Sequence, residues 1–377
     1  MEENDVGQYC DSPGSRIKSG MINLIMNNGK NIILVCGSLA YDHIMDFPGK
    51  FSEHILAGKT HILNLSFTVN AVKESFGGTG GNIAYNLALL GGRPKIIAVA
   101  GKDFSRYKKW LKKNKIDAEY VKVVKTELTA SAYIMTDKAD NQITAYYPGA
   151  KDIIKLNYLK IIGSGLAENF KKLVSDKITI ALDSPRILRG GNDKREGGND
   201  KRTIAIIAPD IVVRMAGYAK IFRQNKIPYI FDPGQQVAYY SADELKYSIL
   251  GAKMLIGNDY EIQLILNKLK IKLGALEKMA EILVITKGGQ GAEIYNKNKK
   301  IVVPAAKKKA VVDPTGAGDA YRAGFIKGLI MDWPLKKCAR LASVVAAYAV
   351  ENQGTQNHRF NWPEVNKRYK DNYNESL

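Results

Sequence analysis

The chain has 377 residues, of which 45% are apolar, and its formal net charge at pH 7 is +19; this length suits one large α/β domain with a subdomain, or two domains. No apolar run reaches the ~18 residues of a membrane-spanning helix, and three distant cysteines and four scattered histidines show neither a disulfide framework nor metal-ligand spacing. The lysines are spread along the whole chain without an RNA-binding motif. We therefore expect a solvated basic surface that attracts small polyanions, and no nucleic-acid partner. The cysteines and the apolar runs lead us to expect a cytoplasmic protein with no membrane partner.

The first elements of the chain are a tail, a strand and a helix. Residues 1–30 are polar and mixed in charge and lack the basic start and apolar stretch of a signal peptide, so we expect a flexible tail. The β-branched run Asn31 to Cys36 ends at a glycine and predicts a buried strand. The glycine cluster Gly77 to Gly81 leads into apolar residues at helical spacing as far as Leu90, which predicts a helix.

Two parts of the chain alternate apolar and polar residues, as a half-exposed sheet does. One is residues 45–76, with an alternating stretch from His61 to Val69. The other comprises Leu128 to Thr136 and Gln142 to Tyr147, with Asp140-Asn141 between them as a hairpin turn. These segments lie outside the strand–helix rhythm of the rest of the chain, and they predict a small separate sheet.

The remainder of the chain alternates short apolar strands with helical patterns. This alternation predicts a parallel sheet with helices on both of its faces. The predicted strands are Ile96–Ala100, Ile178–Leu182, Ile204–Ile207, Tyr229–Phe231, Met254–Ile256 and Leu283–Thr286.

A short tandem duplication occupies residues 190–202. The six residues from Gly190 to Arg195 recur at 197–202. Two polar copies are too few for a solenoid, so we expect a disordered surface loop that is functionally neutral.

The strongest chemical signal is the segment Asp-Pro-Thr-Gly-Ala-Gly-Asp from Asp313 to Asp319. Its residues from Gly316 to Gly318 have almost no side chain, so a bound anion can approach the backbone. The apolar run that follows predicts a buried helix whose first N–H groups point at this turn. A carboxylate beside an anion site suggests a task, and for Asp319 the obvious one is to accept the proton of an attacking hydroxyl. The spacing by itself leaves the alternative that Asp319 is an N-cap.

Two motifs give the chain a resemblance to a known family. Asp313 to Asp319 resembles the carboxy-terminal signature of the ribokinase-like (PfkB) carbohydrate and nucleoside kinases, and Phe76 to Asn82 resembles their amino-terminal signature. The resemblance covers residues 31–370. It implies an α/β fold, with a central, mostly parallel sheet flanked by helices and a small β lid at about 43–75 and 127–150. The implied activity is ATP-dependent phosphoryl transfer to a hydroxyl group.

The resemblance also implies roles for individual residues. Asp319 is the implied catalytic base, Glu261 is implied to hold Mg²⁺ through water, and Asp313 is implied to bind a monovalent cation such as K⁺. The implied anion hole for the phosphoryl group is Gly316, Ala317 and Gly318. The residues implied to bind the acceptor are Asp42, Gly78 and Asn82. The residues implied to bind the nucleotide are Asn258, Thr286, Gly288, Gly291 and Ser343.

Three residues depart from the family pattern. Pro314 replaces the commoner Thr of the carboxy-terminal signature and stiffens the turn. Thr79 stands where ribokinases often carry Lys, which disfavours simple ribose as the acceptor. Ser343 falls near the place where ribokinases tend to have an Asn beside the nucleotide base.

Finer similarities bear on the acceptor. The segments Gly37–Asp42, Asp140–Ala150 and Glu351–His358 resemble a bacterial branch described as adenosine kinases, which implies the 5′-hydroxyl of adenosine as acceptor and a place in purine salvage. Ribose, fructose or a sugar phosphate remain alternatives, as does an inactive ligand-sensing homologue. The enzyme would act as a monomer or a homodimer. We expect some of the lid aromatics to stack on the base; these are Phe67, Tyr133, Tyr146 and Tyr147.

Overall fold

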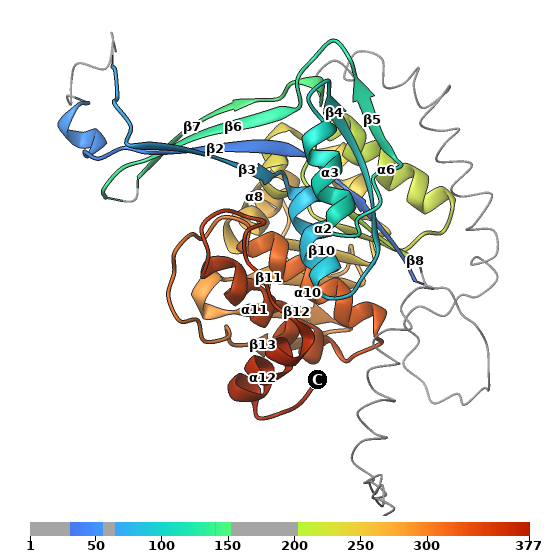
Figure 1. Ribbon diagram of the computed structural model, residues 1–377. Helices are drawn as coiled ribbons and strands as arrows, with labels where there is room; N and C mark the ends of the chain where they lie inside the picture. The colour runs from blue at the N-terminus through green and yellow to red at the C-terminus, as the bar shows by residue number, and fades with distance from the viewer. Residues whose placement is uncertain (1–30, 56–64, 140, 152–202) are drawn as a thin grey trace, which may run out of the picture.

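The computed structural model describes residues 31–55, 65–139, 141–151 and 203–377, and a nine-stranded sheet forms its centre (Figure 1). The strands follow the order β13-β12-β11-β10-β9-β8-β1-β4-β5. All neighbours from β11 to β5 pair in parallel, and β12 and β13 add an antiparallel hairpin at one edge. The bounds are β1 Ile32–Cys36, β4 Pro94–Gly101, β5 Val121–Val124, β8 Thr203–Ile207, β9 Tyr229–Phe231, β10 Met254–Asn258, β11 Ile282–Thr286, β12 Ala292–Asn296 and β13 Lys299–Val303.

The mostly parallel sheet predicted from the strand–helix alternation is confirmed. Each predicted strand that falls on described residues coincides with an observed one to within about two residues. The predicted strand Ile178–Leu182, the tail at 1–30 and the duplicated segment 190–202 lie outside the described residues.

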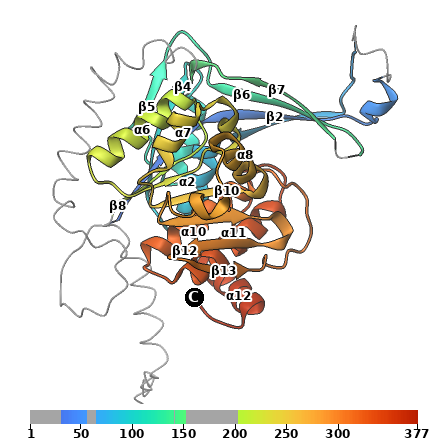
Figure 2. The same cartoon turned by 180° about the vertical axis from the view of Figure 1, so that it is seen from behind.

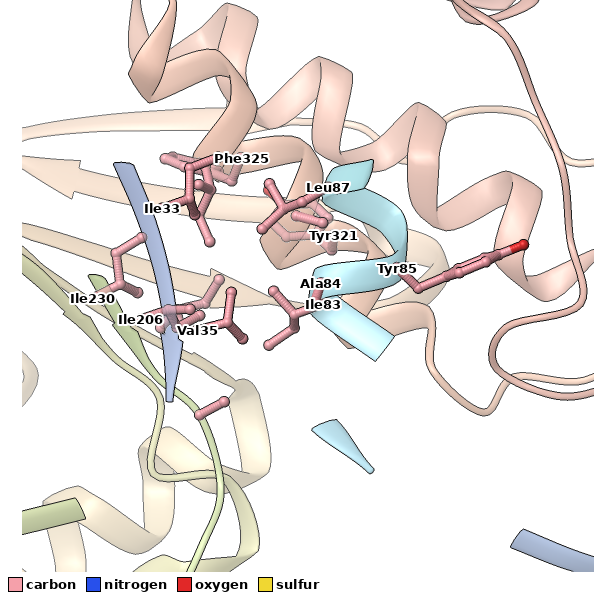
Figure 3. Close-up of a cluster of buried hydrophobic side chains, with 14 of the residues drawn as sticks. Ile33, Val35, Ile83, Ala84, Tyr85, Leu87, Ile206, Ile230, Tyr321 and Phe325 are labelled. Carbon is pink, nitrogen blue, oxygen red and sulfur yellow. The ribbon is translucent and has the colours of Figure 1, made fainter. Parts of the chain in front are cut away.

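Helices cover both faces of this sheet because its central strands are apolar on both sides. Ile33 and Val35 of β1 belong to one buried cluster, and Leu34 and Cys36 belong to another on the opposite face. The first face packs on α2 (Thr79–Leu89), α3 (Ser105–Lys113) and α10 (Ala317–Ile330), as Figure 3 shows for α2 and α10. The second face, seen from behind in Figure 2, packs on α6 (Val212–Gln224), α7 (Ala242–Ile249), α8 (Asp259–Leu269) and the short α9 (Leu273–Leu276).

A second, four-stranded sheet projects from one side of the molecule in the order β3-β2-β6-β7 (Figure 1). Its strands are β2 Ala40–Asp46, β3 Ala71–Gly77, β6 Ala130–Thr136 and β7 Gln142–Tyr147. The antiparallel pairing of β6 with β7 confirms the predicted hairpin. The alternation from His61 to Val69 does not mark a strand over residues 65–69, because pairing with β2 begins only where Ala71 lies opposite Asp46.

The helix that follows the Asp313–Asp319 segment, α10, is fixed by close packing on α11 (Leu335–Val350). A Cβ added to Gly324 would lie 2.6 Å from the Ala342 Cα, so the two helix backbones meet at this glycine. The last helix, α12 (Trp362–Tyr373), packs on α11 in turn. Among the described residues, no helix combines the length and the apolar character that crossing a bilayer requires.

We expect Lys327→Met to stabilise the protein at neutral pH. Lys327 lies on α10 with 1% of its surface exposed, its Nζ has no hydrogen-bond partner among the described residues, and the centroid of the Trp362 ring lies 5.5 Å from that Nζ. Burial lowers the pKa of Lys327 from 10.5 to about 8, which corresponds to at most roughly 3 kcal/mol of lost stability. Because the folded pKa lies below the unfolded one, this loss is complete below pH 8 and fades as the pH rises towards 10.5.

The measurement is the melting temperature of both proteins at pH 7 and pH 10. The Met variant should melt a few degrees higher at pH 7, and the gain should shrink at pH 10. Lys336→Met, which removes an exposed lysine next to the same helix, serves as the control and should change little. A lower melting temperature for Lys327→Met at pH 7 would contradict this reading.

Candidate active site

Polar side chains gather where the parallel strands end. Ser38 follows β1, Asp232 follows β9, and Asn258 and Thr286 end β10 and β11. Because carboxyl ends of parallel strands meet at one edge, these residues lie along the same edge of the sheet. The strands follow one another outward from β1 through β4 to β5 on one side of the sheet and from β8 through β9 to β11 on the other. The position between β1 and β8, where this direction reverses, is a topological switch point. Open α/β sheets bind their ligands at such points.

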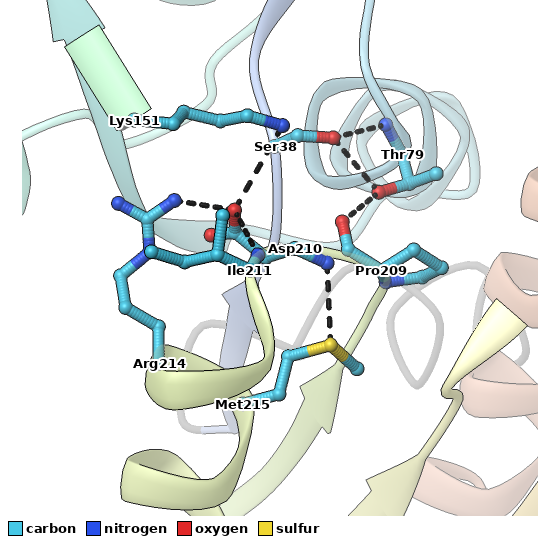
Figure 4. A network of polar contacts seen from close by, with 8 residues as sticks. All are labelled: Ser38, Thr79, Lys151, Pro209, Asp210, Ile211, Arg214 and Met215. Carbon is cyan, nitrogen blue, oxygen red and sulfur yellow. Dashed lines mark hydrogen bonds and ion pairs between the residues drawn. The ribbon is translucent and has the colours of Figure 1, made fainter. Parts of the chain in front are cut away.

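A polar network joins the ends of β1 and β8 at this switch point (Figure 4). The Ser38 Oγ lies 3.1 Å from the Thr79 Oγ1 and accepts the Thr79 N–H at 3.2 Å. The Thr79 Oγ1 donates to the Pro209 carbonyl at 3.0 Å. Thr79 therefore ties the start of α2 to both strands, which gives this departure from the family pattern a structural role.

An anion cradle is formed by the start of α10. Gly316, at the N-cap, has a φ of +79°, which favours glycine, and an added Cβ would lie 3.0 Å from the Thr355 Cγ2. The Ala317 N–H donates to the Pro314 carbonyl at 3.3 Å, whereas the Gly316 and Gly318 N–H groups find no acceptor among the described residues. Unpaired amides at a helix N-terminus attract anions, so two of the three predicted anion-hole residues offer open donors.

Asp319 lies in the first turn of α10 and is 9% exposed. Its Oδ2 accepts a hydrogen bond of 2.8 Å from the Asn82 Nδ2. Burial raises the pKa of Asp319 to about 6, while the nearby positive charge of Arg322 and the Asn82 hydrogen bond limit the rise. The carboxyl group is thus mostly ionised at neutral pH and basic enough to accept a proton.

Asn82, which the resemblance assigns to the acceptor, is hydrogen-bonded to Asp319, and its role in binding the acceptor stays a prediction. Its Oδ1 accepts the Gln356 Nε2 at 3.0 Å, and that nitrogen also donates to the Tyr107 hydroxyl at 2.7 Å. The Trp110 indole holds the other side of the Gln356 amide at 2.9 Å. This chain of bonds fixes the Asn82 amide with its Nδ2 facing Asp319.

The pocket beneath the second sheet, the β2–β6 pocket, has a volume of about 760 Å³. Asp42 lines it and lies against the backbone of Gly77, where an added Cβ would be 1.9 Å from the Asp42 Oδ2. The next residue, Gly78, has a φ of +83° and also packs too closely for a side chain. Burial, together with the charge of Asp313, raises the pKa of Asp42 to about 6. Apolar residues that line the same pocket are Ile44, Met45, Ala71, Ile134, Val311 and Val312.

A second pocket, the α10–α11 pocket, has a volume of about 240 Å³. It lies between the Thr286–Gly291 turn and the two helices, and Ala317 and Gly318 of the cradle line it as well. Four of the five residues predicted to bind nucleotide line this pocket: Thr286, Gly288, Gly291 and Ser343. The Ser343 hydroxyl accepts the Ala306 N–H at 2.7 Å and so holds the facing wall.

The fifth predicted nucleotide residue, Asn258, does not line this pocket but caps α8. The Asn258 Oδ1 accepts the Glu261 N–H at 2.7 Å, and the Glu261 Oε2 accepts the Asn258 N–H at 2.8 Å. The Glu261 Oε1 accepts no hydrogen bond from the described residues. The described residues contain no cluster of three or more acidic, His or Cys side chains for a metal, so a cation here would keep water and substrate oxygens, as Mg²⁺ prefers.

Asp313 links two loops. Its Oδ1 accepts the Thr315 N–H at 2.9 Å, and its Oδ2 accepts the Gly354 N–H at 2.8 Å. Each carboxylate oxygen keeps a second lone pair. Asp313 lines the β2–β6 pocket, and its neighbour Pro314 lines both pockets, so this loop forms the wall between them.

The predicted aromatic residues do not line the β2–β6 pocket. Phe67 packs with Phe47, Phe51 and His54 near the tip of the second sheet. Tyr133 stacks on His43 with ring centroids 4.6 Å apart. The centroid of the Tyr146 ring lies 5.0 Å from the Lys151 Nζ, and the Tyr147 hydroxyl donates to the Glu127 Oε2 at 2.6 Å.

Sequence reasoning missed two residues beside the base, Arg322 and Asp232. Arg322 is 7% exposed and its Nη2 donates to the Asp232 Oδ1 at 2.7 Å. The available signal was an arginine one helical turn after Asp319 in an otherwise apolar run, because a buried charge requires a partner. Its partner lies 90 residues earlier in the chain, and no local pattern identifies it.

Known proteins are similar to this chain over most of its length. The sequence profile of the "pfkB family carbohydrate kinase" group matches residues 38–177 and 213–361. A nucleoside kinase of Methanocaldococcus jannaschii is 29% identical over 343 residues, which cover 90% of this chain and 97% of that protein.

Solved structures are similar over almost the same span. The nucleoside kinase of Burkholderia thailandensis in complex with inosine superposes with a TM-score of 0.74 and 30% identity, covering 92% of this chain and all of that one. The same enzyme in complex with ADP and inosine gives a TM-score of 0.70 at 32% identity, covering 92% of this chain and 97% of that one.

We expect Asn82→Ala to move the acidic limb of the kcat/KM profile to higher pH. A hydrogen bond donated to a carboxylate favours its ionised form, so losing the bond raises the pKa of Asp319 above about 6. One bond to a charged group corresponds to a change of about one pH unit. The measurement is phosphorylation rate from pH 5 to 8. Ser343→Ala, in the α10–α11 pocket, should leave the limb in place. An unmoved limb in Asn82→Ala would argue against Asp319 as the titrating base.

Proposed function

This chain belongs to the pfkB family of carbohydrate kinases and is an ATP-dependent kinase that acts on a hydroxyl group; we propose that its acceptor is a nucleoside, phosphorylated at its 5′-hydroxyl, with adenosine as the preferred substrate. One observation carries this proposal. The glycine-rich start of α10, with Asp319 in its first turn, lies beside the wall between the α10–α11 pocket, which four of the residues predicted to bind nucleotide line, and a larger pocket lined by Asp42.

On this proposal the two pockets bind the two substrates. The α10–α11 pocket takes ATP, with its phosphates directed at the Gly316 and Gly318 amides. The β2–β6 pocket takes the nucleoside, and Asp42 accepts hydrogen bonds from the ribose hydroxyls. The apolar side chains of β2 and β6 then face the base, since a base needs apolar surface that a free sugar does not.

The transfer step follows from these positions. As the acceptor oxygen forms its bond to the γ-phosphorus, Asp319 takes the proton from the hydroxyl. The bond from that phosphorus to the β–γ bridging oxygen breaks, and ADP leaves with the electron pair. Mg²⁺ bound to the phosphates would neutralise part of their charge, and Glu261 is the side chain that would hold it through water. Asp313 is the proposed ligand of a monovalent cation such as K⁺.

A sugar acceptor is the second candidate, because the family profile is that of carbohydrate kinases. Asp42 would serve the hydroxyls of either acceptor. The apolar lining of the β2–β6 pocket favours the nucleoside. A purely ligand-sensing role is disfavoured because Asp319 and the glycines of the cradle are all present.

We expect Asp319→Asn to keep the fold and ATP binding but to lose most turnover. Asn is nearly isosteric with Asp yet cannot take the proton, and the loss of a general base lowers kcat by on the order of 10²–10⁴. The measurement is kcat alongside nucleotide affinity by titration calorimetry. Asp371→Asn, on the exposed side of α12, is the control and should match the unaltered enzyme. Near-normal kcat in Asp319→Asn would remove the residue from the mechanism.

We expect adenosine to be phosphorylated with a much higher kcat/KM than ribose. Burying the base against apolar side chains supplies binding free energy that free ribose lacks, and even 1.4 kcal/mol corresponds to about tenfold. The assay is direct competition among equal concentrations of adenosine, inosine, ribose and fructose 6-phosphate under limiting ATP. If a sugar is consumed first, the nucleoside assignment is wrong while the kinase activity stands.

A further inference from the structure

We propose that Arg322 is a further catalytic residue of this kinase: its guanidinium, held in place by Asp232, contacts the phosphoryl group during transfer from ATP to the acceptor. The proposal rests on the kinase activity and is independent of which acceptor is used. Arg322 lies on α10, one helical turn after Asp319, so its side chain starts from the same end of the helix as the anion cradle.

Two nitrogens of the guanidinium are fixed by one carboxylate. The Arg322 Nη2 donates to the Asp232 Oδ1 at 2.7 Å, and the Arg322 Nε pairs with the Asp232 Oδ2. Asp232 directly follows β9 and is fully buried. A two-point contact with a rigid strand end sets both the position and the plane of the guanidinium.

The third nitrogen, Nη1, lies beside Gly318 of the cradle. A Cβ added to Gly318 would lie 2.6 Å from the Arg322 Nη1, so this nitrogen lies against the backbone that lines the α10–α11 pocket. Nη1 donates to no described residue, and it is not among the fully buried atoms that lack a partner. Its hydrogens are therefore available to a group bound in the cradle.

The surrounding charges call for a cation at this place. The carboxylates that influence the pKa of Asp319 are Asp42 and Glu261, and Arg322 is the one cation among the described groups that act on it. Asp232 adds another negative charge on the far side of the guanidinium. Nucleotide phosphates entering such a site need a positive partner from the protein, and Arg322 is placed to supply it.

Arginine suits the chemistry of this step. As the new bond from the acceptor oxygen to phosphorus forms and the bond to the leaving ADP oxygen breaks, negative charge spreads over the equatorial oxygens of the phosphoryl group. A guanidinium N–H that already points at these oxygens stabilises this charge without reorganisation. The proton still goes to Asp319, so Arg322 acts through charge and hydrogen bonding and remains protonated throughout.

The alternative is that Arg322 only neutralises Asp232 within the core. The double variant Asp232→Asn/Arg322→Met tests this, because it removes both buried charges together, and replacing a buried ion pair by uncharged groups is often neutral for stability. Arg322→Gln, which keeps a hydrogen-bond donor but no charge, is a second and independent test. Each variant is measured for melting temperature, ADP affinity by calorimetry, kcat and the pH profile.

We expect both variants to fold and to lose kcat by about 10²–10³, as the loss of one preorganised donor does. The KM for the acceptor should change by less than about threefold, because Arg322 does not line the β2–β6 pocket. The acidic limb should move to higher pH in both, since the positive charge that favours ionised Asp319 is gone. A merely structural arginine would leave kcat unchanged once the fold is retained, whereas the shift of the acidic limb follows from its charge in either case.

Two results would overturn the proposal. Either folded variant turning over ATP within about threefold of the unaltered enzyme would show that the charge is not needed for transfer. A loss of kcat/KM that comes entirely from acceptor KM, with kcat retained, would assign Arg322 to binding instead. Because the two variants perturb the core differently, a folding failure in one leaves the other to decide.

Discussion

The proposed phosphoryl transfer depends on one constraint, which is that the Asp319 carboxylate must stay ionised although it is buried. Burial disfavours its charge, and a bound polyanion would disfavour it further. Two supports offset this cost: the Asn82 amide, which donates a hydrogen bond to the carboxylate, and the positive charge of the Arg322 guanidinium. Each support is itself anchored, Asn82 by Gln356 and Arg322 by Asp232. Much of the surrounding core therefore serves to hold one proton acceptor at a useful pKa.

In the loop that forms the wall between the two pockets, one carboxylate also has two effects. Asp313 accepts two backbone N–H groups, from Thr315 beside it and from Gly354 on the far loop, so its charge fixes the wall and also acts on Asp42. Because the charge of Asp313 raises the pKa of Asp42, the proposed binding of acceptor hydroxyls by ionised Asp42 is strongest when a cation or another donor balances Asp313. The proposed monovalent cation would meet this need.

The regular parts of this fold could be predicted from the sequence because their signals are local. Buried β-branched runs predicted the parallel strands, and the motif from Asp313 to Asp319 predicted the glycine-rich start of α10 that places Asp319 in its first turn. Contacts between distant segments could not be predicted. The pair of Arg322 with Asp232 spans 90 residues, and the bond from Asn82 to Asp319 spans 237. Only the packing of α2 beside α10 brings Asn82 and Asp319 together, and the acceptor-binding role that the resemblance implies for Asn82 stays a prediction.

The register of the second sheet determines which side chains share the face that lines the β2–β6 pocket. Tyr146 lies opposite Ala132, so it shares a face with Ile134, which lines the β2–β6 pocket, while Tyr133 points to the other face. On the nucleoside proposal, the base would meet the aliphatic side chains of Ile44 and Ile134. Contact with aliphatic side chains stabilises any bound base of similar size. It therefore distinguishes nucleosides from sugars better than it distinguishes adenosine from inosine. Discrimination between bases must then rest on polar groups at the rim, where Lys73 donates to the Gln353 amide oxygen at 3.4 Å.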